Sequence, residues 1–584
     1  MLPKHQETLR KVRNTSSFSF SSIVKNGWAI LGFLMIIFIF LLPVIRLIWL
    51  SITSEGELSL QLYLEVLTAP ATWPVIKNTV WVVVFSSLLA IGMGVGMAWV
   101  MAYVNIRGKK WMNLFIFLPF IVPSYITTLA WVQFFGNNGP IDYLLESFPL
   151  GSISAPNLYS IQGIIFVLGI SHYPLVYLFT VDVFRKIPRD LEQAANVSGA
   201  SKRTVFLKII FPMTLPGIAG GGLLAFLSNL DNFGIPAFLG IPANIRVLST
   251  YIYEQIIGYG PSAFARASVL SVFLGIIALI GTLIQWFVVR KSNVNETAKR
   301  DMEPRYYLSP IWRSVAEIGI WSFLLVSSLV PFIVMAATSF IKAYGVSFKW
   351  ENLSLKNYRY LLFEDQKVMQ AVGNSLSLAL ITLVICAVVG TFLAYLRFKR
   401  NSITMRIVEM ILTIPYALPG TVLALCMILM WVQPILGWKP GVYGTIWILL
   451  IAYITRFLVL QLRGSLTAFT QIDPTMEEAA QTAGASHLAK WSRILLPLLL
   501  PGVIGGALLV GLTALTELTV SSLLWSSGAE TIGVVIFSFE QAGYSTYSTA
   551  FSSLIVLAIL IGGVIFMWME NVWKKRVLRH HDSN

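Results

Sequence analysis

The chain repeats the segment Leu191-Glu-Gln-Ala-Ala-Asn-Val-Ser-Gly-Ala-Ser201, 285 residues later, as Met476-Glu-Glu-Ala-Ala-Gln-Thr-Ala-Gly-Ala-Ser486. The first copy runs on to Ile209-Ile-Phe-Pro212, and the second runs on to Ile494-Leu-Leu-Pro497. Both copies lie on polar, basic loops inside an otherwise apolar chain of 584 residues. A repeated polar segment in such a chain indicates two related halves that each present the same loop.

Each copy of the segment predicts a helix, a tight turn and a second helix. Gly199 and Gly484 suit the left-handed backbone position that closes a helix without steric cost. Ser201 and Ser486 follow two residues later, where a hydroxyl can cap the next helix. A helix–glycine–helix unit on each of two loops is suited to docking a partner at the membrane surface.

The composition predicts a polytopic membrane protein. The chain is 56% hydrophobic and 12% charged, and a soluble domain carries about 25% charged residues. A membrane span needs about 20 apolar residues. We expect twelve spans, at about 28–50, 78–103, 111–134, 160–183, 212–236, 264–289, 315–338, 374–396, 405–431, 442–463, 497–525 and 547–570.

The distribution of positive charge indicates which side of the membrane each loop faces. The formal net charge is +15, but most Lys and Arg residues fall in the loops and tails of one side of the expected bundle. Basic loops stay in the cytoplasm, so we expect both termini and both repeated loops there, and no nucleic-acid partner. The first 27 residues lack an Ala-x-Ala-like cleavage site, which favours an uncleaved anchor. Cys386 and Cys426 fall inside spans and indicate no disulfide framework.

The repetition extends beyond the two loops. Pro119 and Pro123 correspond to Pro415 and Pro419 at an offset of 296 residues. The expected fold is therefore all-α, with two homologous six-helix halves related by a parallel pseudo-twofold repeat. The expected division is a basic N-terminal tail at 1–27, a first half at 28–290 with its loop at about 184–212, a linker at 291–313, a second half at 314–572 with its loop at about 464–497, and a basic tail at 573–584.

The two loops resemble the EAA loop of ATP-binding-cassette (ABC) importer permeases, which reads Glu-Ala-Ala, three residues, Gly, nine residues, Ile, one residue and Leu-Pro. The second copy fits throughout, whereas the first has Gln193 for the Glu and Phe211 for the Leu. The resemblance implies that each loop forms a coupling helix that docks on an ATPase subunit. The implied docking residues are Glu192, Gln193, Ala194, Ala195, Gly199, Ala200, Glu477, Glu478, Ala479, Ala480, Gly484 and Ala485.

The resemblance also implies the partners. They are an ABC ATPase dimer on the cytoplasmic side, an extracytoplasmic substrate-binding protein and the lipid bilayer of a bacterial plasma (inner) membrane, which the chain crosses many times. The sequence contains no Gly-x-x-x-x-Gly-Lys-Ser/Thr phosphate loop. We therefore expect a non-enzymatic permease without a cofactor of its own, whose partner binds ATP and Mg.

Fusion of both halves in one chain resembles the ferric-iron branch of these permeases. The stretches that carry this resemblance are Asn232-Phe-Gly-Ile-Pro-Ala-Phe-Leu-Gly-Ile-Pro242, residues 247–253, Glu517-Leu-Thr-Val-Ser and residues 531–537. The resemblance implies iron(III) as the substrate. Thiamine, polyamine and phosphonate importers share the architecture and stay as alternatives.

Polar residues near the outer ends of two spans are candidates for the translocation path, because polar groups in hydrocarbon often line cavities. They are Asn229, Asp231 and Asn232 in the fifth span and Thr516 and Glu517 in the eleventh. The loop offset places Asp231 opposite Thr516 and Asn232 opposite Glu517. Two interpretations stay open: a carboxylate ring that attracts a cation, or a helix cap at Asp231 with a polar partner for Glu517. No metal-ligand spacing is present among the five histidines.

A secondary transporter of the major facilitator type is the distant alternative, since it also has twelve spans. It would need no EAA loops, and it commonly carries a coupling carboxylate deep in a span. Glu317 and Glu409 are the best candidates for that role, but both lie near the expected cytoplasmic ends.

Overall fold

The structure is a computed structural model that describes residues 30–54, 57–136, 141, 156–258, 262–290, 300–346, 348–400, 402–432 and 441–582. The expected tail at 1–27, residues 291–299 of the expected linker and the last two residues of the chain lie outside the described residues. The secondary-structure elements of the described part are helices apart from one pair of two-residue strands, β1 (Thr53–Ser54) and β2 (Glu57–Leu58), which pair antiparallel.

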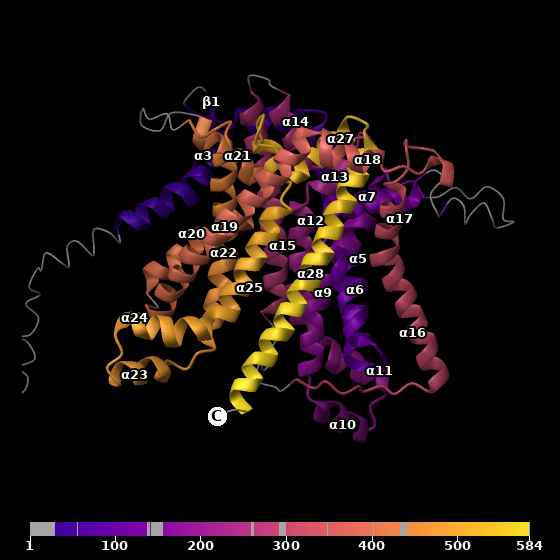
Figure 1. The fold of residues 1–584 in the computed structure, drawn as a ribbon, viewed down its shortest axis with the longest axis vertical. Coiled ribbons are helices and arrows are strands. Elements are labelled where there is room, and N and C mark those ends of the chain that lie inside the picture. Colours follow the sequence, from indigo (N-terminus) through magenta and orange to yellow (C-terminus); the bar gives the residue numbers. More distant parts are fainter. Residues whose placement is uncertain are drawn as a thin grey trace, which may run out of the picture.

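The first half begins at the membrane span Ile30–Ser51, which includes a π-helical turn. Its further elements follow the chain as a series of long and short helices (Figure 1). They are η2 (Ile37–Leu41), α3 (Leu42–Ser51), α4 (Gln61–Thr68), α5 (Thr72–Tyr103), α6 (Lys109–Ile121), α7 (Ser124–Phe135), α9 (Ile161–Lys186), α10 (Arg189–Val197), α11 (Lys202–Val205), η3 (Phe206–Ile210), α12 (Phe211–Asp231), α13 (Gly234–Gly240), α14 (Leu248–Ile257) and α15 (Ala263–Val289).

The second half repeats this series. Its elements are α16 (Pro310–Leu324), η4 (Leu325–Leu329), α17 (Val330–Thr338), η5 (Trp350–Asn352), α18 (Lys356–Arg359), η6 (Tyr360–Glu364), α19 (Gln366–Lys399), α20 (Ile403–Ala417), α21 (Gly420–Val432), α22 (Ile446–Thr470), α23 (Pro474–Thr482), α24 (His487–Lys490), η7 (Trp491–Leu495), α25 (Leu496–Leu515), α26 (Ser521–Leu524), α27 (Ile532–Gln541) and α28 (Ser545–Asp582). The expected C-terminal tail therefore continues the last helix as far as Asp582.

Two of the twelve expected spans are broken helices. The described residues contain ten helices long and apolar enough to cross a membrane, and two bent pairs in addition. Helices α6 and α7 meet at 103°, and α20 and α21 meet at 109°. The breaks fall at Pro123 and Pro419, because a proline disfavours the helical conformation of the residue before it. The spans expected at 111–134 and 405–431 are thus present as bent helix pairs.

Two other expected spans end earlier than expected. The fifth and eleventh spans, expected to reach residues 236 and 525, end as α12 at Asp231 and as α25 at Leu515. Short helices α13 and α26 then begin after a change of backbone direction. The polar residues at these two ends therefore sit at helix breaks, where backbone groups need partners.

Prolines also explain four of the π-helical turns. A proline ring clashes with the carbonyl of the residue four positions earlier, and a π turn widens the helix at that place. The turns η2, η3, η4 and η7 each contain the residue four positions before Pro43, Pro212, Pro331 or Pro497. The two halves therefore share the same local deformations.

The first membrane helix of each half lies against the other half (Figure 1). In the first half, α3 packs on α21 of the second half, and η2 contacts α20. In the second half, α17 packs on α7 of the first half, and η4 contacts α6. This reciprocal exchange joins the halves into one bundle.

The two repeated loops lie at the same end of the bundle. Figure 1 shows α10, α11, α23 and α24 at the lower end, and the short helices α13, α14 and α27 at the upper end. The long helices α5, α9 and α12 pack on one another in the first half, as α19, α22 and α25 do in the second. The structure thus places a pair of like loops below a paired helical core.

Candidate functional site

The first repeated loop has the geometry that its sequence predicts. Helix α10 is followed by Gly199 with a φ of +82°. The amide of Ala200 donates to the carbonyl of Ala195 at 3.0 Å, which satisfies a helix-end carbonyl. The hydroxyl of Ser201 accepts from the amide of Thr204 at 3.2 Å and caps the next helix.

The second repeated loop uses the same bonds. Gly484 has a φ of +79°, the amide of Ala485 donates to the carbonyl of Ala480 at 3.0 Å, and Ser486 accepts from the amide of Ala489 at 3.2 Å. A Cβ atom added at Gly199 or Gly484 would meet no atom within 4 Å. The need for glycine is therefore conformational and does not come from crowding.

The docking residues expected in the first loop differ in exposure. Gln193, Ala194 and Gly199 are exposed, and Ala195 and Ala200 are half-buried. Glu192 instead turns its carboxylate inward to form an ion pair with Arg305 of the linker, and its side chain is 13% exposed. The loop thus presents its small residues and Gln193 to solvent, and uses Glu192 internally.

In the second loop, Ala479 and Gly484 are exposed, Ala485 is half-buried and Ala480 is buried. The side chains of Glu477 and Glu478 lie outside the described part of the structure. The loop begins at Asp473, whose carboxylate accepts from the backbone amide of Thr475 at 2.9 Å. This hydrogen bond holds the pKa of Asp473 below its usual value. The matched position in the first loop is Pro188, which makes no side-chain cap.

A cavity of about 490 Å³ lies between the two halves. Its wall includes four of the five candidate path residues, namely Asp231, Asn232, Thr516 and Glu517. Both proline breaks also line the cavity, together with Tyr125, Ser171, His172 and Arg456. The sequence offset therefore brought together residues that the fold does place around one cavity.

Asn232 and Glu517 perform the same local role in the two halves. The side-chain oxygen of Asn232 accepts from the amide of Ile235 at 2.9 Å, at the start of α13. The carboxylate of Glu517 accepts from the amide of Val520 at 2.6 Å, at the start of α26. Each residue thus supplies a hydrogen-bond acceptor where a membrane helix breaks and a short helix begins.

Asp231 joins the first half to the second. One carboxylate oxygen accepts from the amide of Gly420 at 2.5 Å, at the start of α21. The other accepts from Arg456 of α22 at 2.6 Å. Arg456 also lies 3.6 Å from the carboxylate of Glu517. The side chains of Arg456 and Glu517 are 8% and 9% exposed, and that of Asp231 is 35% exposed.

The two carboxylates therefore share one guanidinium and do not form a free acidic ring. The cap interpretation holds for Asp231, but the helix that it caps is α21 of the other half. Gly420 is required at this place, since a Cβ there would lie 2.1 Å from an Arg456 nitrogen. The group is a charged contact between halves that borders the cavity.

Asn229, the fifth candidate path residue, is not among the residues that line this cavity. Its side chain is buried between helices, where its oxygen contacts Nδ1 of His172 at 2.7 Å and its NH₂ group donates to Ser87 at 3.0 Å. These bonds tie α12 to α9 and α5. The amide is satisfied by its neighbours and acts in helix packing.

Aromatic rings of the two halves meet in one cluster. Phe537 of α27 lies with its ring centroid 5.7 Å from Phe233, 5.5 Å from Phe238 and 5.9 Å from Tyr253. The three partner rings belong to the first half, and Phe537 belongs to the second. This aromatic contact between halves lies at the end opposite the repeated loops (Figure 1).

The carboxylates considered for a secondary transporter are held in ion pairs. Glu317 pairs with Arg313 at 2.9 Å and accepts from the amide of Arg107 at 2.8 Å. Glu409 pairs with Arg397 at 2.8 Å. Neither carboxylate lines the central cavity.

Sequence reasoning missed two arginines of the site. Arg456 lies inside the expected span 442–463, and an ionisable residue within an apolar span is itself a signal of function or of a buried partner. Arg305 lies in the expected linker, where an arginine gives no comparable signal. Among the described residues, no group of three or more His, Cys, Asp or Glu side chains is placed to hold a metal ion.

Two like helical halves, a cavity between them and a pair of repeated loops at one end define a transport permease of the membrane. Residues 90–292 and residues 386–579 each match the family described as binding-protein-dependent transport system inner membrane component. The chain therefore belongs to this family and carries two copies of its domain. It is an ABC importer permease in the fused two-half form.

Relatives of this chain include other fused permeases. A ferric transport system permease of Actinobacillus pleuropneumoniae is 22% identical over 544 residues, which cover 93% of this chain and 78% of the relative. An Fe(3+)-transport system permease of Haemophilus influenzae is 23% identical over 529 residues, covering 90% and 95%. A putrescine transport system permease of Escherichia coli is 29% identical over 273 residues, covering 46% of this chain and 93% of the relative.

Proposed function

We propose that this chain is the permease of a bacterial iron(III) importer. A binding protein outside the membrane delivers the ion, and a separate ATPase dimer supplies the energy. The observation that carries the substrate assignment is the extent of similarity. The two ferric permeases align over nine-tenths or more of this chain, through both halves and the linker. The putrescine permease aligns over less than half of it.

The two repeated loops are the proposed docking points for the ATPase. They lie at one end of the bundle, and each combines an exposed helix with a left-handed glycine and a capped second helix. One copy from each half suits a partner that is itself a dimer, with one subunit for each loop. ATP and Mg bind in that partner, and this chain contributes no catalytic residue and no cofactor.

The cavity between the halves is the proposed translocation path. Its wall carries the carboxylates of Asp231 and Glu517 and the guanidinium groups of Arg456 and Arg463, so these charges balance when all four groups are ionised. The hydroxyls of Tyr125 and Ser171 are buried on the same wall and have no hydrogen-bond partner among the described residues. Unsatisfied hydroxyls and two carboxylates on the wall suit the brief passage of a hydrated cation.

Passage from the binding protein requires the upper end of the bundle to open. The rings around Phe537 and the Asp231–Arg456 ion pair both join one half to the other, so both contacts change when the halves separate. Closure of the ATPase dimer would bring the two docking loops together and part the halves above the cavity. This coupling is alternating access, driven from the loop end.

The substrate is tested with the reconstituted permease, ATPase and binding protein in proteoliposomes. We expect iron(III), presented by its binding protein, to stimulate ATP hydrolysis more than thiamine, putrescine or 2-aminoethylphosphonate. Stimulation by thiamine alone would overturn the iron assignment and leave the importer assignment intact. A matched control omits the binding protein, which removes the stimulation.

The path is tested by removing charge without removing hydrogen-bond acceptors. The double variant Asp231→Asn with Glu517→Gln should lower iron uptake while the protein reaches the membrane at normal levels. The control is Thr516→Val, which changes a cavity residue without changing charge. Unchanged uptake in the double variant would show that the carboxylates serve only as caps and pairs.

The orientation is tested with introduced cysteines, because both native cysteines are buried. Val197 at the end of α10 and Trp350 at the opposite end of the bundle are each 89% exposed. We place the docking loops and both termini in the cytoplasm. An impermeant maleimide should therefore label Trp350→Cys in intact spheroplasts and Val197→Cys only after permeabilisation. The reverse pattern would invert the topology.

A further inference from the structure

The linker between the halves is attached to the first half as an extended strap. We define the linker strap as residues 300–308. The amide of Asp301 donates to the carbonyl of Arg185 at the end of α9, at 2.7 Å. The amides of Arg305 and Tyr306 both donate to the carbonyl of Tyr103 at the end of α5, at 2.8 and 2.9 Å. The strap therefore follows the loop end of two core helices.

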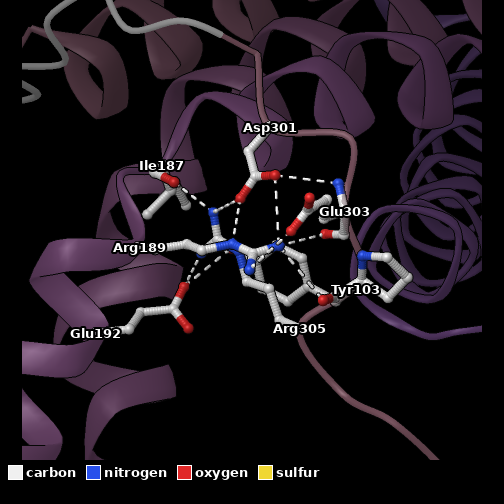
Figure 2. A network of polar contacts seen from close by, with 8 residues as sticks. Tyr103, Ile187, Arg189, Glu192, Asp301, Glu303 and Arg305 are labelled. Carbon is white, nitrogen blue, oxygen red and sulfur yellow. Dashed lines mark hydrogen bonds and ion pairs between the residues drawn. The ribbon is translucent and has the colours of Figure 1, made fainter.

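Arg305 connects this strap to the first docking helix. Its side chain is 6% exposed and forms an ion pair with Glu192 of α10. It also donates to the carbonyl of Ile187, which precedes α10, and to the hydroxyl of Tyr103 at 3.1 Å. The guanidinium lies over the Tyr103 ring, 4.5 Å from its centroid. Figure 2 shows these groups converging on one side chain.

A second arginine fastens the beginning of the docking helix. Arg189, the first residue of α10, donates to the carboxylate of Asp301 at 2.5 Å and to the carbonyl of Glu303 at 3.0 Å (Figure 2). The hydrogen bond with Asp301 raises the pKa of Arg189. Burial lowers the pKa of Arg305, but a guanidinium stays charged in proteins. Both ion pairs are therefore present throughout the physiological pH range.

Joining the two halves does not by itself require the linker to be bonded to the core helices. A flexible connection of this length could pass freely below the bundle, but the strap is bonded to α5, α9 and α10 at once. After the second half, the chain continues as one helix, α28, as far as Asp582. Within the described residues, the second docking loop is thus followed by no strap of this kind.

We propose that the linker strap is a positioning element that fixes the first docking helix α10 to the core helices α5 and α9, with Arg305 as its central residue. The first loop is then set in place before the ATPase arrives, and its movement is transmitted directly to α5. The second docking helix takes its position by docking. This inference rests on the proposed docking function of the loops.

Hydrogen exchange of the full-length permease alone, in detergent or nanodiscs, tests the positioning without any partner. Arg305→Gln should speed exchange of the α10 amides by about tenfold or more, since a charge-assisted hydrogen bond to a local element is lost. The amides of α23 should be unaffected. The matched control is Arg300→Gln in the same strap, whose ion pair with Asp182 is 60% exposed on the arginine side. An exposed pair contributes little, so α10 should keep its protection.

If Arg305→Gln does not accumulate, Glu192→Gln removes the same ion pair and leaves Arg305 bonded to the carbonyl of Ile187. Where both variants accumulate, their double-mutant cycle should be strongly non-additive, because the two residues act through one contact. Wild-type exchange of α10 in a folded Arg305→Gln or Glu192→Gln permease would overturn the inference.

The assembled importer gives a second readout. Arg305→Gln should lower the number of ions transported per ATP hydrolysed by about tenfold, more than it lowers ATP hydrolysis, because a loose α10 transmits less motion to α5. Arg305→Lys should recover part of the coupling, since lysine keeps the charge but not the planar fork. If the wild-type permease bound no ATPase, the proposed docking function would fail, while the exchange result would still decide whether the strap positions α10.

Discussion

The first and second halves repeat the same backbone devices but place their charged groups differently. Both halves have a proline-broken helix pair, a π turn before a proline, a left-handed glycine in the docking loop and a cap where the membrane helix breaks. In the first half, a buried ion pair lies at the loop end, between Arg305 and Glu192. In the second half, Arg456 and Glu517 lie at the central cavity, and Ser171 and Asn232 occupy the matched positions of the first half.

This difference separates two tasks that one sequence repeat must perform. Backbone geometry sets where helices end and turn, and it depends on proline, glycine and capping residues that both halves contain. Ion pairs determine which contacts are stabilised and which groups face the cavity or the docking loop. Each half has its own set of ion pairs. The comparison therefore predicts that backbone variants impair both halves in the same way, though to different extents, whereas charge variants act in one half only.

The largest effect is expected for Arg456→Met. It leaves Glu517 buried and Asp231 without its ion pair, and breaking a buried ion pair in this way costs about 3–5 kcal/mol. We expect a lower melting temperature of the purified permease and loss of uptake. Ser171→Ala at the matched position is the control. Its free energy of unfolding should lie within about 0.5 kcal/mol of the wild-type value. Equal melting of Arg456→Met and the wild type would mean that the charged group at the cavity does not hold the halves together.

The next largest effect concerns the docking glycines. Gly199→Val and Gly484→Val each force a β-branched residue into the left-handed region, at a cost of about 1–2 kcal/mol or more, with no clash because the space is open. Both variants should insert normally and lose uptake and ATPase association, as measured by pull-down and transport in the same cells. Gly484→Val should be the more severe, because its loop retains the family's Glu478 and the first loop has the strap to hold it.

The control for the glycine variants is Gly543→Val, another left-handed glycine in open space, at the opposite end of the bundle. It should retain ATPase association. Wild-type association and uptake in both docking variants would show that these loops do not dock the ATPase.

A smaller effect is expected for Glu517→Asn, which copies the first half into the second. Asparagine at the matched position 232 already caps a helix, so the cap should survive and stability should fall by about 1 kcal/mol or less. Uptake of iron should fall, because the cavity loses a carboxylate. Asn232→Ala, which removes the cap of the first half and no charge, should lower stability by about 1 kcal/mol and spare uptake. Normal uptake in Glu517→Asn together with reduced uptake in Asn232→Ala would exclude a role for the charge of Glu517.

The smallest effect distinguishes the two loops by pH. Asp473 caps the second docking loop with a depressed pKa, so its contribution is present above the unfolded pKa of about 3.9 and is lost as pH falls through the folded value. Pro188 at the matched position has no titrating group. Hydrogen exchange measured from about pH 5 to about pH 3 and corrected for intrinsic rates should show α23 loosening before α10. Asp473→Asn should remove the difference, and a loosening of α10 first would contradict the assignment.

Much of this architecture follows from the sequence. Hydropathy and basic loops predict the spans, and the repeated glycines predict the left-handed turns that the structure contains at 199 and 484. The proline positions indicate the repeat in the sequence, but they do not by themselves predict where the helices break. Pro123 and Pro419 turn two expected spans through more than a right angle, because a helix break depends on whether neighbouring elements can satisfy the freed backbone groups.

The candidate path was predicted less well, for a physical reason. The offset of the repeat brought Asp231, Asn232, Thr516 and Glu517 to one cavity, as the structure shows. It could not supply Arg456, because one partner, Asp231, ends a helix of the other half, and the other partner, Glu517, lies between two helices. Pairings across 225 residues, such as that of Asp231 with Arg456, depend on how helices pack and leave no periodicity in the sequence. The same holds for Arg305 and Glu192.

The exchange of first helices has a consequence for how the protein is made. As the chain is synthesised from its N-terminus, α3 enters the membrane long before its partner α21 exists. Its contacts with α21 can form only after more than half of the chain has been inserted. Helices α6 and α7 likewise gain their contacts with η4 and α17 only after those elements have been synthesised. Proteins of this size commonly assemble domain by domain, but here neither half can complete its own packing. A gene cut within the linker should therefore yield two chains that accumulate only when they are produced together.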